Sequence, residues 1–276
     1  MSYLSNTPPP KKRSLGQNFL QDRNVSQKIV NSLSIGASDY VLEIGPGAGA
    51  LSHLIAEQSP QNFILLEKDY YWAEQHGNWA KEYSFKYQPV LIDALTFSWP
   101  KLARIDVAWK LVGNLPYNVA SPLIWDIVEK TPNWQLAVFM VQKEVGMRMA
   151  SPSGTREYGA LSVWVQSFAK VERLFIVPPG AFDPRPKVDS AVMRLIPVER
   201  KLLCRPENLS KLLKICFQQR RKQIKNILKG HWNNNLEKFL DKQELNPENR
   251  PETLTPLQFQ KLANFMFEDI VLDIDH

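Results

Sequence analysis

The chain has 276 residues, a formal net charge of +6 at neutral pH and two cysteines, Cys204 and Cys216. This length exceeds one average domain and predicts a large domain together with a smaller one. No apolar run approaches the roughly 20 residues of a membrane helix, two cysteines cannot form a disulfide framework, and four scattered histidines do not suggest a metal site.

The N-terminal segment, residues 1–14, is expected to be a flexible basic arm. Three prolines at positions 8–10 precede Lys11, Lys12 and Arg13. The apolar core typical of a signal peptide is missing. We therefore expect a cytoplasmic protein with reduced cysteines.

Residues 40–197 alternate short apolar runs with amphipathic stretches, which is typical of an α/β fold with a parallel sheet. The predicted strands are 40–44, 63–66, 89–92, 107–112, 136–141, 174–177 and 188–196. The predicted helices are 49–58, 70–82, 121–130, 143–150 and 158–169. A proline-rich loop, residues 178–186, joins the last two strands, which we expect to pair antiparallel at a sheet edge.

After Pro197 the β-branched runs stop, and apolar residues recur at helical spacing. We therefore predict one domain over residues 15–198 and a smaller, all-helical domain over residues 199–276.

The first predicted strand runs into a glycine-rich turn, residues 45–49, that opens a helix. Gly45 and Gly47 let the backbone approach a ligand. With Ala50 the turn also satisfies the dinucleotide fingerprint, so the turn alone leaves the cofactor open. Glu67 ends the next strand, where an acid can bind ribose hydroxyls.

Two further residues favour S-adenosylmethionine as the cofactor. Asp93, followed by Ala94, ends the third strand, where it can accept a hydrogen bond from an adenine amino group. Asn114 ends the fourth strand and suits methyl transfer rather than hydride transfer. Either acid by itself could be a solvated strand end or a helix cap. Their order after the glycine turn, at the ends of successive strands, favours a cofactor site.

The tetrapeptide Asn114-Leu115-Pro116-Tyr117 is the predicted target site. An exocyclic amine is a poor nucleophile because its lone pair is delocalised into the ring. Acceptors for its two hydrogens, the Asn114 carboxamide oxygen and the Leu115 carbonyl, would aim that lone pair at a methyl group. Pro116 fixes the backbone, and Tyr117 offers a face for stacking. The alternative is a tight turn with an ordinary buried tyrosine.

Phe182 is the predicted second wall of the target site. It lies in the proline-rich loop, where Pro184 and Pro186 reduce flexibility and could present its ring opposite Tyr117. A base held between two rings must leave its helix or loop, as in base flipping. The alternative is core packing, but the neighbouring polar and proline residues favour an exposed phenylalanine.

These motifs, taken in order, resemble the ribosomal RNA adenine dimethyltransferase family. The likeness spans residues 15–226, and its elements are residues 15–20, the Gly45 turn, Glu67, Asp93-Ala94, the tetrapeptide, and residues 140–145, 182–191 and 217–222. It implies a Rossmann-like class I S-adenosylmethionine-dependent methyltransferase sheet. It also implies that Gln17, Asn18 and Leu20 fold over the methionine end of the cofactor.

The resemblance, which is strongest to the bacterial small-subunit enzymes, also implies a substrate. Two methyl groups would pass to N6 of each of two adjacent adenosines in a hairpin loop near the 3′ end of 16S rRNA, in an assembling 30S subunit. No obligate protein partner is expected. Residues 146–148 depart from the more acidic segment of the family, so no contact is assigned to them.

The positive charge is concentrated in one segment. Residues 201–231 contain nine lysines and arginines and one acid, Glu207. Phosphate contacts need charge without base readout, and the predicted RNA-binding residues are Arg220, Arg221, Lys222 and Lys225. The alternative is a solvated helix face.

Three other functions fit part of the sequence. A large-subunit rRNA adenine methyltransferase would share the fold and the tetrapeptide, but residues 182–191 and the C-terminal helices favour the small-subunit enzyme. A non-catalytic RNA-binding assembly factor would retain the fold, but intact Gly45, Glu67, Asp93 and Asn114 oppose it. A dinucleotide oxidoreductase would need a hydride-transfer constellation that the sequence lacks.

Overall fold

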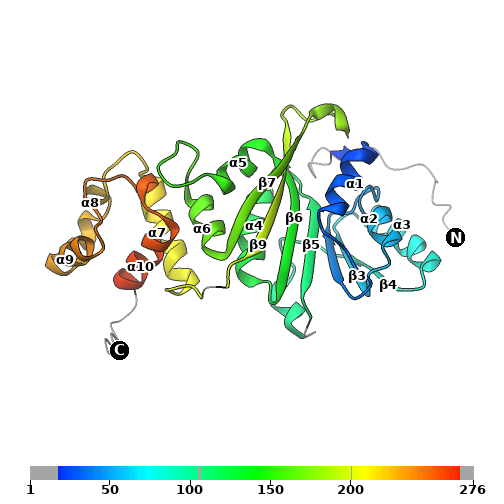
Figure 1. The fold of residues 1–276 in the computed structure, drawn as a ribbon, viewed down its shortest axis with the longest axis horizontal. Coiled ribbons are helices and arrows are strands. Elements are labelled where there is room, and N and C mark those ends of the chain that lie inside the picture. Colours follow the sequence, from blue (N-terminus) through cyan, green and yellow to red (C-terminus); the bar gives the residue numbers. More distant parts are fainter. Residues whose placement is uncertain (1–17, 105–106, 200, 268–276) are drawn as a thin grey trace. The chain divides into compact units, whose positions relative to one another are not determined.

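The computed structural model describes residues 18–104, 107–199 and 201–267, which form two compact units (Figure 1). The first unit comprises the described residues up to Gly146 together with Glu172–Pro197. The second comprises Met147–Val171 and the described residues from Val198 onward. The predicted basic arm and Gln17 lie outside the described residues.

A seven-stranded sheet with the order β4-β3-β2-β5-β6-β9-β7 lies mainly in the first unit. Its strands are β2 (Tyr40–Ile44), β3 (Asn62–Glu67), β4 (Lys86–Leu91), β5 (Trp109–Asn114), β6 (Trp134–Gln142), β7 (Ala169–Val177) and β9 (Ser190–Pro197). Strands β2 to β6 pair in parallel, and β9 runs antiparallel to β6. Each predicted strand overlaps one of these, and the last two, β7 and β9, are neighbours at an edge as expected.

The strand order places a ligand crevice at β2. From β2 the chain passes to β3 and β4 on one side and returns to β5 on the other. Ile44 is paired with Leu66 of β3 and with Gly113 of β5. The residues that follow these three positions therefore meet at the carboxyl edge of the sheet, where the order reverses and open α/β sheets bind ligands.

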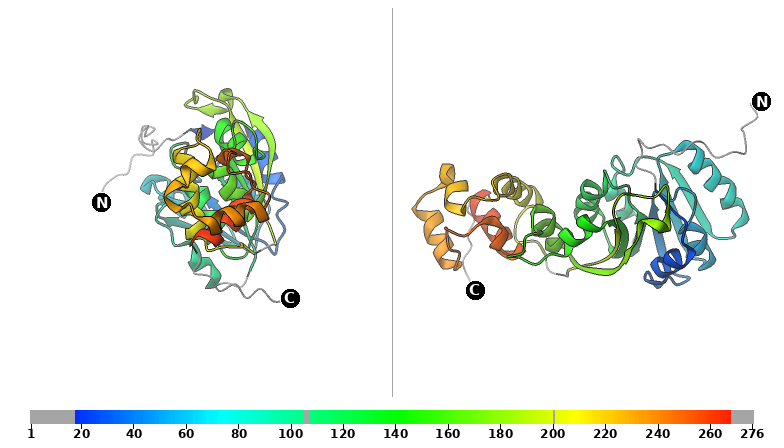
Figure 2. Two further views of the ribbon diagram at one scale, coloured as in Figure 1. Left: turned by 90° about the vertical axis from the view of Figure 1, so that its left-hand side faces the viewer. Right: turned by 90° about the horizontal axis from the view of Figure 1, so that it is seen from above.

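Short helices connect the strands of the first unit. They are α1 (Arg23–Asn31), α2 (Ser52–Glu57), α3 (Tyr70–Trp79) and α4 (Ala120–Lys130), and 3-10 turns cover Ala80–Glu82, Trp99–Arg104 and Pro179–Ala181. Helix α5 (Lys143–Ala150) begins in the first unit and ends in the second. The Asp22 and Asp69 side chains cap α1 and α3 by accepting backbone N–H bonds. Seen from above, helices lie on both sides of the strands (Figure 2).

The second unit is helical. Its helices are α6 (Ala160–Phe168), α7 (Pro206–Gln218), α8 (Ile224–Ile227), α9 (Asn234–Lys242) and α10 (Pro256–Phe267), with 3-10 turns at Lys229–His231 and Pro251–Thr253. Helices α6, α7 and α10 contact one another, and the buried Tyr158 hydroxyl donates to the Leu254 carbonyl at 2.8 Å. Residues 147–171, which the predicted division placed in the first domain, therefore group with the helical unit.

A second sheet of two strands joins the start of the described residues to the loop between β7 and β9. Strand β1 (Phe19–Leu20) pairs antiparallel with β8 (Phe182–Asp183), so that Leu20 lies opposite Phe182. We call residues 18–20 the strap. In the described ranges, no helix has the length and apolar character needed to cross a membrane.

Candidate active site

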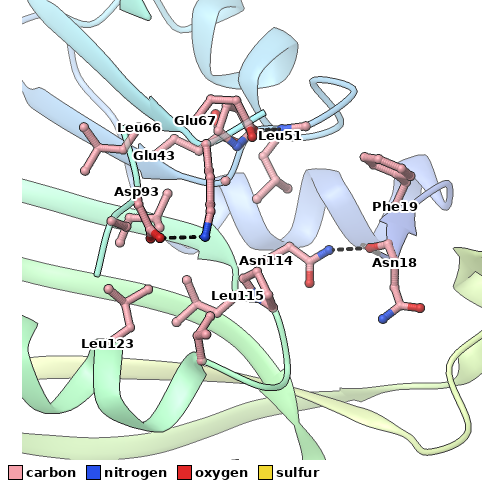
Figure 3. A pocket seen from close by; sticks show the side chains of 18 of the residues that line it. Asn18, Phe19, Glu43, Leu51, Leu66, Glu67, Asp93, Asn114, Leu115 and Leu123 are labelled. Carbon is pink, nitrogen blue, oxygen red and sulfur yellow. Dashed lines mark hydrogen bonds and ion pairs between the residues drawn. The ribbon is translucent and has the colours of Figure 1, made fainter. Parts of the chain in front are cut away.

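One pocket opens at the carboxyl ends of β2, β3 and β5 (Figure 3). Of the predicted cofactor residues, those that line it are Asn18, Leu20, Gly45, Gly47, Glu67, Asp93, Ala94 and Asn114. The pocket is also lined by Leu115, Pro116 and Tyr117 of the predicted target site. The structure thus brings residues from five separate sequence segments to one cavity.

Gly47 shows why the turn needs glycine. Its φ is +51°, and a Cβ atom there would lie 2.8 Å from Cε1 of the Phe19 ring. The Gly47 N–H donates to Oε2 of Glu67 at 3.0 Å, while the Asp69 N–H donates to Oε1 at 2.7 Å. Glu67 therefore holds the turn against the end of β3, and burial raises the pKa of its carboxyl.

Replacing Glu67 with Gln is expected to weaken S-adenosylmethionine binding about tenfold. Both carboxylate oxygens accept backbone N–H bonds, and a glutamine must turn its amide NH₂ toward one of these donors. Calorimetric titration with the cofactor measures the effect. Glu57→Gln on the exposed face of α2 is the matched control and should bind normally; equal affinities for both variants would contradict this role of Glu67.

Asp93 lines the pocket beside a lysine that the sequence prediction did not consider. Lys68 Nζ donates to Asp93 Oδ2 at 2.7 Å, and the Leu95 N–H donates to Oδ1 at 3.0 Å. The hydrogen bond from Lys68 lowers the pKa of the Asp93 carboxyl. Asp93 is thus an ionised acceptor at the pocket wall, which suits a contact with an amino group.

Asn114 is held in one orientation. Its Nδ2 donates to the Asn18 carbonyl at 2.9 Å. Because a carbonyl can only accept, the amide nitrogen must face the strap, and the amide oxygen points away from Asn18 (Figure 3). An acceptor is therefore presented inside the pocket, while the same side chain ties down the strap.

The rest of the tetrapeptide is anchored to β6 and β9. The Leu115 N–H donates to the Met140 carbonyl at 3.0 Å, which fixes the peptide that follows β5. The Tyr117 hydroxyl lies 2.6 Å from Ser190 Oγ, and burial raises the pKa of this phenol. The tyrosine is half-buried and lines the pocket, so it is more than a core residue.

The prediction that Phe182 forms an exposed wall of the target site is wrong. We expected an exposed ring, but the side chain is only 3% exposed and belongs to the main hydrophobic core. It is not among the described residues that line the pocket. The reason is the β1–β8 pair, because Leu20 lies opposite Phe182. Prolines in a loop indicate stiffness, but they do not show which side chains a distant segment covers.

The sequence prediction missed two buried ionisable residues, Glu43 and His76. Glu43 lines the pocket and is 1% exposed, and burial raises the pKa of its carboxyl to about 8. His76 on α3 is fully buried, and burial lowers the pKa of its imidazole to about 4. An acid inside an apolar strand beside the glycine turn could have identified Glu43, whereas no local pattern marks His76.

The predicted RNA-binding residues lie in the second unit and differ from one another. The Arg220 guanidinium donates to the Arg156 carbonyl and lies 3.9 Å from Glu252, so it is partly used within the unit. Arg221, Lys222 and Lys225 are exposed. Of the four predicted residues, these three therefore expose their charge to a polyanion most fully.

Cys204 and Cys216 are both buried and are not joined in a disulfide. Among the described residues, no group of three or more histidine, cysteine, aspartate or glutamate side chains could hold a metal ion.

Comparisons with known proteins agree with this geometry. Residues 10–268 match the family model described as ribosomal RNA adenine dimethylase. The chain is 51% identical over 274 residues to "Ribosomal RNA small subunit methyltransferase A" of Oleidesulfovibrio alaskensis, covering 98% of this chain and 96% of the relative. The protein of that name from Herminiimonas arsenicoxydans is 39% identical over 260 residues, covering 92% of this chain and 98% of the relative.

A solved structure shows the same likeness. A dimethyladenosine transferase from Plasmodium falciparum superposes with a TM-score of 0.73 at 28% identity, covering 88% of this chain and 95% of that one. The 23S rRNA methyltransferase ErmE superposes with a TM-score of 0.68, covering 91% of this chain and all of that one. Its 23% identity shows a shared fold alone.

Proposed function

This chain belongs to the ribosomal RNA adenine dimethylase family, and from that premise we propose that it dimethylates N6 of two adjacent adenosines near the 3′ end of 16S rRNA. The family is S-adenosylmethionine-dependent, so this cofactor is the methyl donor and ribosomal RNA the substrate. The two adenosines lie in a hairpin loop of an assembling 30S subunit, and we place the reaction in the cytoplasm.

The observation that carries the proposed chemistry is the fixed orientation of Asn114. Its amide nitrogen is engaged by the Asn18 carbonyl, which leaves the oxygen as an acceptor in the pocket. We assign to this oxygen one hydrogen of the adenine amine and to the Leu115 carbonyl the other. Two acceptors localise the nitrogen lone pair, and Tyr117 supports the base by stacking.

The transfer is a displacement at the cofactor's methyl carbon. When bound, the cofactor would supply an electrophilic methyl group: the N6 lone pair would form the new nitrogen–carbon bond as the carbon–sulfur bond breaks with its electron pair left on sulfur. The cationic nitrogen would then lose one proton to solvent water. In the second round the amine has a single hydrogen, so one acceptor is enough to orient it.

The choice of small-subunit RNA is supported by the relatives. Several curated proteins called "Ribosomal RNA small subunit methyltransferase A" match over more than nine-tenths of both chains. The alternative substrate, large-subunit rRNA, is an outcome of the test.

The test is to incubate the protein with methyl-labelled cofactor and unmethylated 30S particles, and then to map the labelled nucleotides. We expect label on N6 of two adjacent adenosines near the 3′ end of 16S rRNA. Label that enters only 23S rRNA in a parallel reaction would contradict the substrate assignment. A protein that binds the cofactor but labels neither RNA would be a non-catalytic factor.

The exposed basic residues of the second unit give a further prediction. Replacing both Arg221 and Lys222 with Glu should weaken binding to 30S particles about tenfold or more at low salt and make the affinity less dependent on salt, because fewer counterions are released. Filter binding over a series of salt concentrations measures both.

The matched control for this variant is Lys238→Glu with Lys242→Glu. These two lysines are exposed on α9 and give the same change in net charge. A uniform loss of affinity in both double variants would show only an effect of total charge and would remove the Arg221–Lys222 surface from the proposal.

A further inference from the structure

A buried chain of polar side chains lies directly behind the cofactor pocket. His76 Nε2 lies 2.9 Å from the Gly47 carbonyl, and His76 Nδ1 lies 2.6 Å from the Tyr87 hydroxyl. The Tyr87 and Ser52 side chains interact, and the Ser52 hydroxyl donates to Glu43 Oε2 at 2.6 Å. All four side chains are at least nine-tenths buried.

The two ends of this chain are pocket residues, whereas its middle is not. Gly47 and Glu43 line the pocket, but His76, Tyr87 and Ser52 are not among the described residues that do. Gly47 is held on both sides, because Glu67 accepts from its N–H and His76 donates to its carbonyl. The chain thus connects the turn after β2 with an acid inside β2, through α3, β4 and α2.

The position of the hydrogen on His76 follows from the Gly47 carbonyl. A carbonyl cannot donate, so His76 carries its hydrogen on Nε2, and its bare Nδ1 accepts from the Tyr87 hydroxyl. At the other end, the Ser52 hydroxyl donates to Glu43 Oε2 at 2.6 Å. These short, buried hydrogen bonds make the series of side chains a rigid support.

We propose that His76 and Tyr87 are positioning residues for the methyl donor, which hold the Gly47 carbonyl and the Glu43 carboxyl in the geometry that binds S-adenosylmethionine. Neither side chain contacts the cofactor. They act through the glycine turn and through Glu43. The proposal deepens the function above and rests on its cofactor site, but it does not depend on which RNA is methylated.

The test measures S-adenosylmethionine binding by the full chain without RNA. His76→Leu leaves the Gly47 carbonyl and the Tyr87 hydroxyl without their partner and should raise the cofactor Kd about 10- to 100-fold. Tyr87→Phe removes one hydroxyl and should raise it about 3- to 10-fold. His76→Gln should restore most of the affinity, because a carboxamide again offers one donor and one acceptor.

The control separates positioning from stability. Tyr158→Phe removes a fully buried tyrosine hydroxyl that donates to Leu254 in the second unit. It should lower Tm by as much as Tyr87→Phe but leave the cofactor Kd unchanged. In the methylation assay, the His76 and Tyr87 variants should raise KM for the cofactor and leave kcat and KM for RNA near their original values.

The outcomes are distinct. If Tyr87→Phe and His76→Leu fold and both bind the cofactor as tightly as the unaltered chain while Tyr87→Phe loses Tm like Tyr158→Phe, the pair is merely structural and the inference is wrong. If the unaltered chain binds the cofactor and the variants lose affinity as expected, the inference is supported, even if 30S particles are not methylated. Failure of the unaltered chain to bind S-adenosylmethionine would overturn both the inference and the proposed function.

Discussion

Replacing Asn114 with Ala should lower kcat about 10²- to 10³-fold, while the Kd for S-adenosylmethionine changes by no more than about threefold. The reason is that the Asn114 oxygen is needed where the amine develops charge, and the cofactor keeps its other contacts. The small change in Kd reflects the lost tie to Asn18, whose carbonyl accepts from the Asn114 amide. Single-turnover methylation and calorimetry measure the two effects separately.

A second variant decides which half of the amide matters. Asn114→Asp keeps an oxygen acceptor and loses the donor to Asn18. If the acceptor carries the chemistry, the Asp variant should be at least about tenfold more active than the Ala variant. If activity depends instead on the hydrogen bond to the strap, the Asp and Ala variants should be equally impaired. Activity of Asn114→Ala close to that of the unaltered chain would remove Asn114 from the mechanism.

The second large effect is expected from Glu43 and depends on pH. Burial is the main cause of its raised pKa, the Ser52 hydrogen bond opposes the rise, and the negative charge of Glu67 adds to it. The folded-state pKa of about 8 compares with an ordinary value of 4.5. Between these values the folded chain keeps a proton that the unfolded chain has lost.

This difference in pKa decides how the free energy of unfolding changes with pH. Below the unfolded value both states are protonated, and Glu43 costs no stability. As pH rises toward the folded value, the folded state binds more protons than the unfolded state, so the free energy of unfolding falls. Near pH 8 Glu43 also ionises in the folded state, and the free energy of unfolding stops falling. By then Glu43 has lowered the free energy of unfolding by roughly 3–5 kcal/mol.

Glu43→Gln should remove this penalty, because a neutral amide replaces the protonated carboxyl and its oxygen can still accept from the Ser52 hydroxyl. Without cofactor, the variant and the unaltered chain should have similar stability at about pH 5, whereas the variant should be more stable at about pH 8. Urea unfolding across this range measures the difference. Ser26→Ala in α1, another buried polar position, is a control whose effect should not vary with pH. A difference between Glu43→Gln and the unaltered chain that is constant with pH would contradict a neutral Glu43.

Most cofactor-binding residues of the pocket could be predicted because each directly follows a strand that its own local sequence pattern indicates. The glycine turn, Glu67, Asp93 and Asn114 each follow an apolar run, and parallel strands bring their carboxyl ends to one edge. Once the runs are recognised as neighbouring strands, the side chains after them must meet. The seven strands were predicted for the same reason, since strand periodicity is a local property.

Contacts between distant segments were not predictable in this way. Helix α6 lies in the sequence between β6 and β7 of the sheet, yet it packs with α7 and α10, which come tens of residues later. Arg220 looked like one of a basic run, but Arg156 and Glu252 use its guanidinium. Neither pairing leaves a periodic pattern at its own position.

By itself the sequence determined the class of sheet, the cofactor turn and the order of the acids and Asn114 along the strand ends, because these depend on local periodicity and on the rules of parallel sheets. Only the tertiary structure decided that Phe182 is buried, that the strap is tied to Asn114, and that His76 supports Gly47. Each of these contacts joins residues at least 29 positions apart, and no local pattern records which segments fold over one another.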